Sequence, residues 1–470
     1  MERKRREMKR KLLPLALSLA LLAACTPAPA PTPTAEATPS PTPAAAVDFH
    51  AFLDEVNETR RAVIEDGEPL DISAWTPDFT DQNHTFTDEE IEVLLTRRDM
   101  VDYLPLEQAR EDLDIFFTLL RTTYGAYEYF GGDEVFEELK AEAIQRLEDS
   151  AGTGSTLVRL ATALYGALEG TVLDGHFTIA GSHLVPPLYT YYVPDVYISD
   201  PAGLSEDYVK PTIGPDGAIT YGFFAMSEDG SDLPDTLGGY ELDWTLCEPV
   251  GRGNFVFAEK EYRGIPTLQS RYMSADTPEE EAQLERFASC GGEYADVPLL
   301  IFDVRSNPGG SDWWFMEWFN GWTGQYAQPH KCTGHRYSQI GCYFLDYPDE
   351  AMGTWQVSSR PGRWVKREGL TFLLTDAATA SAGEDVLLDL HTVENTLVVG
   401  VNTGGCSLVP DNFTCYLPNT GLPIFFGTGL GFYETMENRD TVGYAPDLWV
   451  NPPDAMEAVA RMCEYYGLRG

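Results

Sequence analysis

The stretch 380–386, Ala-Ser-Ala-Gly-Glu-Asp-Val, joins two apolar segments near the end of the chain. Residues 370–374 before it (Leu-Thr-Phe-Leu-Leu) are typical of a buried strand, and the periodic run 386–390 predicts a helix. A serine at such a strand-to-helix turn exposes its hydroxyl beside a helix N-terminus, which stabilises developing negative charge. Ser381 is therefore a candidate nucleophile. The alternative is a plain helix cap, because Ser381 with Glu384 three residues later also fits a capping box.

A second motif lies upstream of this serine. Residues 297–303 (Val-Pro-Leu-Leu-Ile-Phe-Asp) form an apolar run that ends at a carboxylate, as expected of a buried parallel strand. The run continues into 304–310, Val-Arg-Ser-Asn-Pro-Gly-Gly, and an aromatic segment that predicts a helix. Paired glycines free the backbone to turn sharply and to point an N–H at a ligand, although Asn-Pro-Gly-Gly alone is also a common turn.

In this order, the two motifs resemble those of the C-terminal-processing (tail-specific) and tricorn-like serine peptidases. That family carries D-[LV]-R-x-N-x-G-G and, further along, A-S-A-x-E, which residues 303–310 and 380–384 match. Residues 398–405 resemble its Gly-rich turn after the nucleophile helix, and 443–450 resemble its closing G-x-x-P-D-x-x-V. The resemblance implies an α/β fold with a crotonase/ClpP-like core. It also implies a serine-type endopeptidase that cleaves peptides or proteins through an acyl-enzyme, without a cofactor.

The resemblance also bears on the general base. The best-known members use a lysine downstream of the nucleophile, but Lys366 is the last lysine of this chain, so that layout is excluded. The tricorn-like branch uses a histidine, and residues 173–178 (Leu-Asp-Gly-His-Phe-Thr) match its D-[GS]-H-[TF] pattern. The ordinary pKa of histidine lies near neutrality, so its ring can take and return a proton. His176 is thus the implied base, His183 is the nearest rival, and an ordinary loop histidine is the alternative.

An acid that orients the imidazole is the third expected group. The family places a glutamate shortly before its closing motif and a serine beside the histidine, but here Gly175 stands in place of that serine. Glu437-Asn438 resembles the family's E-N, so Glu437 is the favoured candidate. Three other acids remain as rivals: Asp174, Glu434 and Asp440.

Backbone N–H groups should form the oxyanion hole of such an enzyme. The resemblance implies the N–H groups of Gly310 and Ala382, with Gly309 as the rival donor. Two other classes of function keep the fold without the chemistry. One is an inactive surface protein that binds peptides or other ligands, and the other is an envelope lipoprotein in which Ser381 is only a cap.

The N-terminus reads as an export signal. Basic residues at 3–11 precede the apolar run 12–22, which is shorter than a membrane-spanning helix. Residues 22–25, Leu-Ala-Ala-Cys, resemble a bacterial lipobox with Cys25 as the lipidated residue, and a plain signal peptide cut near Ala24 is the alternative. The Pro/Thr/Ala-rich run 26–46 is typical of an extended spacer. These features predict a protein anchored by lipid to the cell membrane, on its extracytoplasmic side.

Composition excludes several kinds of partner and site. The net charge is −42, which argues against nucleic acid or anionic lipid as the partner of the folded part. No Cys or His spacing indicates a metal. Apart from Cys25 there are seven cysteines, and the spacings of Cys332/Cys342 and Cys406/Cys415 would allow disulfides outside the cell.

The sequence predicts six segments. They are a signal peptide (1–24), a linker (25–47), a polar N-terminal extension (48–100), a helical subdomain that carries His176 (101–185), a β-rich insert in the position of a PDZ domain but without evident PDZ features (186–296), and the α/β peptidase core (297–470).

Overall fold

A computed structural model describes residues 47–468, except for 83, 151, 153 and 346. Its largest sheet has ten strands in the order β8-β3-β5-β4-β19-β15-β14-β11-β10-β9. The middle of this sheet is parallel and is formed by β10 (Ile265–Ser270), β11 (Leu299–Asp303), β14 (Leu370–Thr375), β15 (Thr396–Gly400) and β19 (Leu448–Trp449). The predicted α/β core is thereby confirmed.

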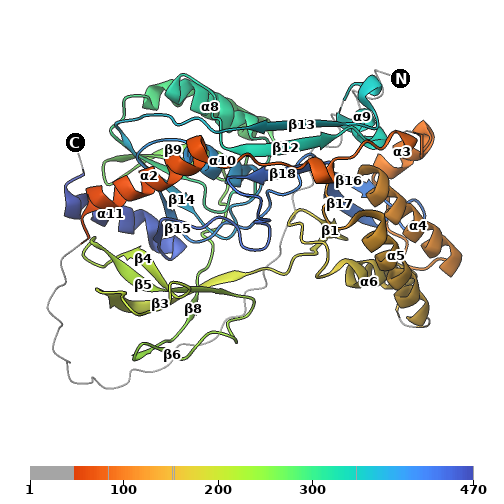
Figure 1. Ribbon diagram of the computed structural model, residues 1–470, viewed down its shortest axis with the longest axis horizontal. Helices are drawn as coiled ribbons and strands as arrows, with labels where there is room; N and C mark the ends of the chain where they lie inside the picture. The colour runs from red at the N-terminus through yellow and green to blue at the C-terminus, as the bar shows by residue number, and fades with distance from the viewer. Residues whose placement is uncertain (1–46, 83, 151, 153, 346, 469–470) are drawn as a thin grey trace.

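Helices cover both faces of this parallel region (Figure 1). Side chains alternate along a strand, so Leu300 and Phe302 of β11 lie in the cluster on one face and Ile301 in the cluster on the other. The first face carries α7 (Pro278–Ser289), α8 (Trp313–Thr323) and α10 (Ala382–Leu390). The second face carries α2 (Phe49–Asp66) and α11 (Ala455–Tyr466).

The N-terminal segment is tied into this core. Arg60 of α2 donates to the carbonyl oxygen of Thr396 and to the carboxylate of Asp447, both at 2.6 Å. Asp447 belongs to the Pro-Asp pair of the closing motif, so the first described helix braces the last motif of the chain. Further along, α3 (Asp88–Leu95) buries Ile91 and Leu94 against the helical subdomain.

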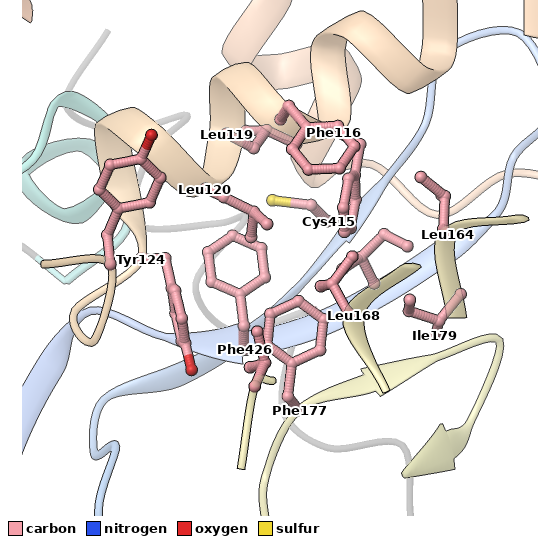
Figure 2. Packing of buried hydrophobic residues seen from close by; sticks show 14 of the residues in the cluster. Phe116, Leu119, Leu120, Tyr124, Leu164, Leu168, Phe177, Ile179, Cys415 and Phe426 are labelled. Carbon is pink, nitrogen blue, oxygen red and sulfur yellow. The ribbon is translucent and has the colours of Figure 1, made fainter. Parts of the chain in front are cut away.

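The helical subdomain predicted from the periodicity is present and packs on a separate four-stranded sheet. Phe116, Leu120 and Leu168 on its helices meet Phe177 and Phe426 in one buried cluster (Figure 2). The sheet has the order β16-β17-β1-β2, and β1 follows His176 directly. The elements are α4 (Leu106–Thr123), α5 (Gly132–Asp149), α6 (Thr156–Leu168), β1 (Thr178–Ile179), β2 (Ser182–His183), β16 (Asn412–Tyr416) and β17 (Pro423–Gly427).

The β-rich region extends the large sheet at both ends. β4 joins the core strand β19 through the pair Thr212 and Trp449, and β9 forms a hairpin with β10. The strands of this region are β3 (Tyr189–Ile198), β4 (Val209–Ile213), β5 (Ile219–Ser227), β6 (Thr236–Leu237), β7 (Tyr240–Glu241), β8 (Thr245–Leu246) and β9 (Phe257–Tyr262). A three-stranded sheet and a helix complete the fold: β12 (Lys331–Arg336), β13 (Trp355–Arg360), β18 (Gly429–Tyr433) and α9 (Gln339–Leu345).

The cysteines correct one prediction. The spacing would allow disulfides between Cys332 and Cys342 and between Cys406 and Cys415, but neither pair is bonded to each other in the structure. Cys415 is held in the apolar cluster beneath the helical subdomain, whereas Cys406 lies on the Gly-rich turn of the core.

The predicted export segments lie largely beyond what the structure describes. The signal peptide, Cys25 and the linker through residue 46 fall outside the described residues. Within 47–468, leaving aside the few undescribed positions, no helix is both long and apolar enough to cross a membrane.

Candidate active site

Ser381 occupies a strained turn between β14 and α10. It is the N-cap of α10, with φ 54° and ψ −126°. A non-glycine residue with positive φ is uncommon, and such a conformation costs about 1–3 kcal/mol, which the surrounding structure must offset. Ordinary N-caps take extended backbone angles. The geometry therefore differs from that of a simple cap and matches the sharp strand-to-helix turn that exposes a nucleophilic serine.

The two motifs that define the family resemblance lie against each other. The N–H of Ala380 donates to the carbonyl oxygen of Asn307 at 2.9 Å. A Cβ built on Gly309 would lie 2.8 Å from the Cβ of Ser381, and φ at Gly309 is +105°. Any larger residue at position 309 would therefore collide with the nucleophile turn. The fold brings the paired glycines to the serine, as the sequence predicts.

The backbone donors around Ser381 can be distinguished by their hydrogen bonds. The N–H of Gly309 donates to Oδ1 of Asn307 at 2.9 Å, so it is already used. The N–H groups of Gly310 and Ala382 have no acceptor among the residues that the structure describes. The pattern favours Gly310 and Ala382 over Gly309 as the pair that would meet an oxyanion.

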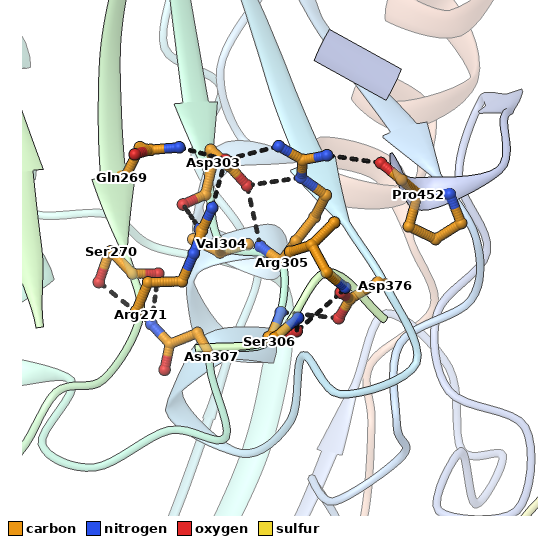
Figure 3. A network of polar contacts seen from close by, with 12 residues as sticks. Gln269, Ser270, Arg271, Asp303, Val304, Arg305, Ser306, Asn307, Asp376 and Pro452 are labelled. Atoms are coloured by element: carbon orange, nitrogen blue, oxygen red, sulfur yellow. Dashed lines mark hydrogen bonds and ion pairs between the residues drawn. The ribbon is translucent and has the colours of Figure 1, made fainter. Parts of the chain in front are cut away.

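A buried ionic network fixes the turn that carries these glycines (Figure 3). Asp303, which is fully buried, accepts from Arg305 at 2.8 Å and from Arg271 at 2.6 Å. Burial alone would raise the pKa of Asp303, but the two guanidinium groups bring it well below its usual range. Gln269 donates to the same carboxylate at 2.9 Å. Gln269 lies on β10 and Arg271 directly follows it, outside the D-x-R motif, so no sequence motif indicates that these two residues bind Asp303.

A second buried carboxylate secures the same turn from the other side. Asp376, which follows β14, accepts from the N–H of Ser306 at 2.7 Å and from its hydroxyl at 3.0 Å. Because Ser306 itself has a positive φ of 58°, the backbone between Asp303 and Gly310 is fixed by side chains rather than by a regular ladder.

His176 sits in a loop held by two buried aspartates. Asp174 accepts from the N–H of His176 at 2.8 Å and from the hydroxyl of Tyr124 at 2.9 Å. Asp440 accepts from the N–H of Gly175 at 2.9 Å. Burial raises the pKa of Asp174 to about 8, with a further contribution from the charge of Asp440. These acids hold the backbone on either side of the histidine.

The ring of His176 is less constrained than its backbone. Its Nδ1 is buried and has no hydrogen-bond partner within the described residues. Burial, and then the nearby His183, lower the pKa of His176 to about 4. His183 is exposed on β2, and its Nδ1 donates to the carbonyl oxygen of Gly175 at 2.8 Å. The rival histidine thus supports the same loop.

Glu384 connects the nucleophile turn to the histidine loop. Its carboxylate accepts from the N–H groups of Ser381 at 3.2 Å, Gly405 at 2.8 Å and Cys406 at 2.7 Å. A Cβ on Gly175 would lie 2.1 Å from the carbonyl oxygen of Gly405, so the histidine loop rests on this Gly-rich turn. Burial raises the pKa of Glu384 to about 7. The sequence offered Glu384 only as a capping residue, and its reach to Gly405 and Cys406 needed the fold.

The candidate acids before the closing motif lie in different places. The side chain of Glu437 is 68% exposed and pairs with Arg439 at 2.7 Å, so the structure does not bring it to His176. Glu434 pairs with His391 at 2.7 Å. Asp440 is the acid of this segment that contacts the histidine loop. Within the described chain, no hydrogen bond joins the side chains of His176 and Ser381.

Comparison with known proteins identifies the region that contains this site. The sequence profile of peptidase family S41 matches residues 269–448. The matched region contains both motifs of the candidate site, 303–310 and 380–384, and resembles that family. The family match supports the prediction of a tail-specific, S41-like serine peptidase. No protein of curated function matches the chain.

Several solved structures are similar to this chain. A putative peptidase from Parabacteroides merdae shares 17% identity, with 74% of this chain and 92% of that chain covered and a TM-score of 0.40. Mature CPAF complexed with lactacystin shares 13% identity, with 77% and 99% covered and a TM-score of 0.42. The photosystem II D1 C-terminal processing protease shares 13%, with 73% and 93% covered and a TM-score of 0.36. At these scores we base no residue assignment on the three structures.

Proposed function

We propose that this protein is a lipid-anchored, extracytoplasmic endopeptidase in which Ser381 is the nucleophile and His176 the general base. The observation that carries the proposal is the strained backbone of Ser381, with φ 54°, set against Gly309 and beside two N–H groups that have no acceptor among the described residues. Strain of this kind persists only where the surroundings enforce it, and it is concentrated at functional sites.

The reaction would follow the course of acyl transfer to serine. Ser381 Oγ attacks the carbonyl carbon of the scissile peptide while a ring nitrogen of His176 takes the hydroxyl proton. The N–H groups of Gly310 and Ala382 donate to the oxyanion of the tetrahedral intermediate. The intermediate collapses as His176 gives the proton to the leaving amine, which leaves an ester on Ser381. Water then hydrolyses this ester, with His176 again as the base.

The state of His176 suits its role in part. A pKa lowered to about 4 keeps the ring neutral at neutral pH, so it can accept a proton. The same shift makes it a weak base. A bound substrate would change the surroundings of the His176 ring and therefore its pKa. We expect the ionisation of His176 to appear in the pH dependence of kcat.

The test of the nucleophile is a fluorophosphonate probe, which labels activated serines. The wild-type chain should be labelled and Ser381→Ala should not, while both unfold at similar denaturant concentrations, because loss of a cap costs only about 0.5–2 kcal/mol. Ser407→Ala is the matched control, since Ser407 lies on the neighbouring turn and hydrogen-bonds Tyr444 at 3.0 Å. Equal labelling of folded Ser381→Ala would refute the assignment.

The anchoring part of the proposal rests on sequence alone. The Leu-Ala-Ala-Cys run and the Pro/Thr/Ala spacer support lipidation of Cys25. Cys25→Ser should shift the protein from the membrane fraction to the soluble or secreted fraction, or block its processing. If Cys25→Ser fractionates and migrates as the wild type does, the lipoprotein assignment fails.

One observation favours the alternative of an inactive, ligand-binding member of the family. Nδ1 of His176 is buried and has no acceptor in the described part of the chain, whereas a triad histidine donates this proton to an acid. If the protein only binds ligands, the wild type and the Ser381→Ala variant should bind peptides with equal affinity, and neither should cleave them. The labelling experiment separates the two functions.

A further inference from the structure

Three aromatic residues lie close in sequence to the proposed oxyanion donor Gly310 or to its bridge partner Met273. Met273, which pairs with Gly310 in a parallel bridge, donates its N–H to the carbonyl oxygen of Gly309 at 2.8 Å and accepts from the N–H of Ser311 at 2.9 Å. Tyr272 immediately precedes Met273, and Trp313 lies three residues after Gly310. We call Tyr272, Trp313 and Trp314 the aromatic rim.

Two members of the rim are anchored in the core beneath the site. Tyr272 and Trp314 are partly buried and pack against the same cluster that contains Met273 and Ala382, the residue after the nucleophile. Trp313 meets Trp314 edge to face, with ring centroids 4.8 Å apart. The aromatic rim is therefore anchored to the buried cluster that contains Met273 and Ala382.

The start of α8 also lies close to the start of α10. The pKa of Asp385, one helical turn after Ser381, is raised to about 7 by burial and then by the charge of Asp312. Asp312 is the residue immediately before Trp313 and caps α8. Phe315 near the start of α8 and Ala382 at the start of α10 also lie in the same buried cluster, so the two helices pack on the same face of the sheet.

Trp313 is unusual within its own helix. Phe315, Trp318, Phe319 and Trp322 of α8 are buried in the core, but Trp313 is 50% exposed. The core therefore does not bury this indole completely. Tyr272 has one face covered by Arg252, at 4.2 Å from its ring centroid. Trp313 is thus the exposed member of the rim, whereas Tyr272 and Trp314 are partly buried.

We propose that Trp313, backed by Trp314 and Tyr272, forms the subsite for an aromatic or large apolar side chain of the substrate next to the scissile bond. This inference rests on the proposed peptidase function of Ser381. Large flat side chains suit such a wall because they bury much area against an indole and pack edge to face with it. The subsite would raise affinity for such peptides without taking part in bond breaking.

The test compares Trp313→Ala and Trp313→Phe on a peptide that the wild type cleaves and on its alanine-scanned series. Trp313→Ala should lower kcat/KM about ten- to hundredfold, mostly through KM, for peptides that keep the aromatic or apolar residue. Peptides with alanine at that position should be cleaved equally by both, and Trp313→Phe should restore most of the loss. Tyr326→Ala is the matched control, because Tyr326 is 46% exposed just beyond the other end of α8, a helix about 16 Å long.

Two further measurements distinguish failure of the subsite from failure of the proposed peptidase function. The rate of fluorophosphonate labelling should be the same in Trp313→Ala and wild type, since the small probe does not need the subsite. Peptide binding to Ser381→Ala, measured by fluorescence anisotropy of a labelled peptide, should weaken when Trp313→Ala is added. An equal loss for every peptide, or unchanged binding, would overturn the subsite, whereas an unlabelled wild type would overturn the peptidase function alone.

Discussion

The nucleophile turn and the histidine loop differ in how they are held. Around Ser381, the positions of the backbone are fixed by buried side chains from several core strands, among them Asp303, Asp376 and Glu384. Around His176, Asp174 and Asp440 fix only the backbone, and Nδ1 of the ring has no partner in the described chain. One half of the site is preorganised and the other is positioned only through its main chain.

The largest expected effect is on the nucleophile side. Asp303→Ala would leave Arg271 and Arg305 buried without their shared carboxylate, and breaking a buried ion pair in this way costs about 3–5 kcal/mol of stability. Denaturant unfolding measures the loss. Glu142→Ala breaks an exposed pair with Arg146 and should cost no more than about 0.5 kcal/mol. A similar stability of the two variants would show that the network does not hold the turn.

Gly310→Val tests the preorganised donor. A Cβ at this position would lie 2.4 Å from the backbone of Met273, and φ there is +123°, so the turn must move and carry the N–H away. Losing one such donor costs about 2.7–4 kcal/mol of transition-state stabilisation, which is a loss of about a hundred- to a thousandfold in kcat. KM should change much less. Steady-state kinetics of the folded Gly310→Val variant measure this loss. A normal kcat would show that the oxyanion hole lies elsewhere.

His176→Ala tests the less constrained half. We expect at least about a hundredfold loss in kcat, the lower end for removal of a general base. His183→Ala should lose less, because His183 supports the loop through the carbonyl group of Gly175. Glu437→Gln should leave kcat unchanged, since this exposed acid pairs with Arg439. If activity survives His176→Ala but not His183→Ala, the two histidines have been assigned the wrong way round.

The smallest effect concerns the pH dependence of stability. Burial raises the pKa of Asp174 to about 8 and that of Asp440 to about 6. Both carboxyl groups thus favour the protonated form more in the folded than in the unfolded chain. Their contribution to stability is complete below pH ~4 and is lost as the pH rises towards 8. Asp174→Asn should flatten this slope in thermal unfolding between pH 5 and 9. Identical slopes in variant and wild type would contradict the shift.

The same contrast explains what the sequence could predict. The nucleophile motif and the paired glycines each end a core strand, so short patterns and the order of the motifs were enough to bring Ser381 to Gly309 and Gly310. The role of His176 as the base could be predicted only from the family resemblance, because its loop comes from a different part of the chain. Arg271, Gln269 and Glu384 act across strand and turn boundaries, which no local pattern records.

The position of the acid near His176 and the pairing of the cysteines could not be predicted from the sequence for a related reason. Glu437 was chosen by its position in the chain before the closing motif, but a few residues decide which side chain points inward, and it is Asp440 that is buried. Hairpin-like spacing favoured a pair between Cys406 and Cys415, yet the two residues belong to different packing units. Spacing along a chain does not report which cluster a side chain joins.

The pairing of β1 with β17 has a consequence for the life of the newly made chain. Thr178, two residues after His176, aligns with Phe425, which is synthesised long after both His176 and Ser381. Arg60 likewise finds Asp447 only when the closing motif has emerged. A partly synthesised chain therefore holds Ser381 and His176 without the contacts that support their loops. Such a peptidase would be silent until its last strands are delivered, which protects the cell that makes it.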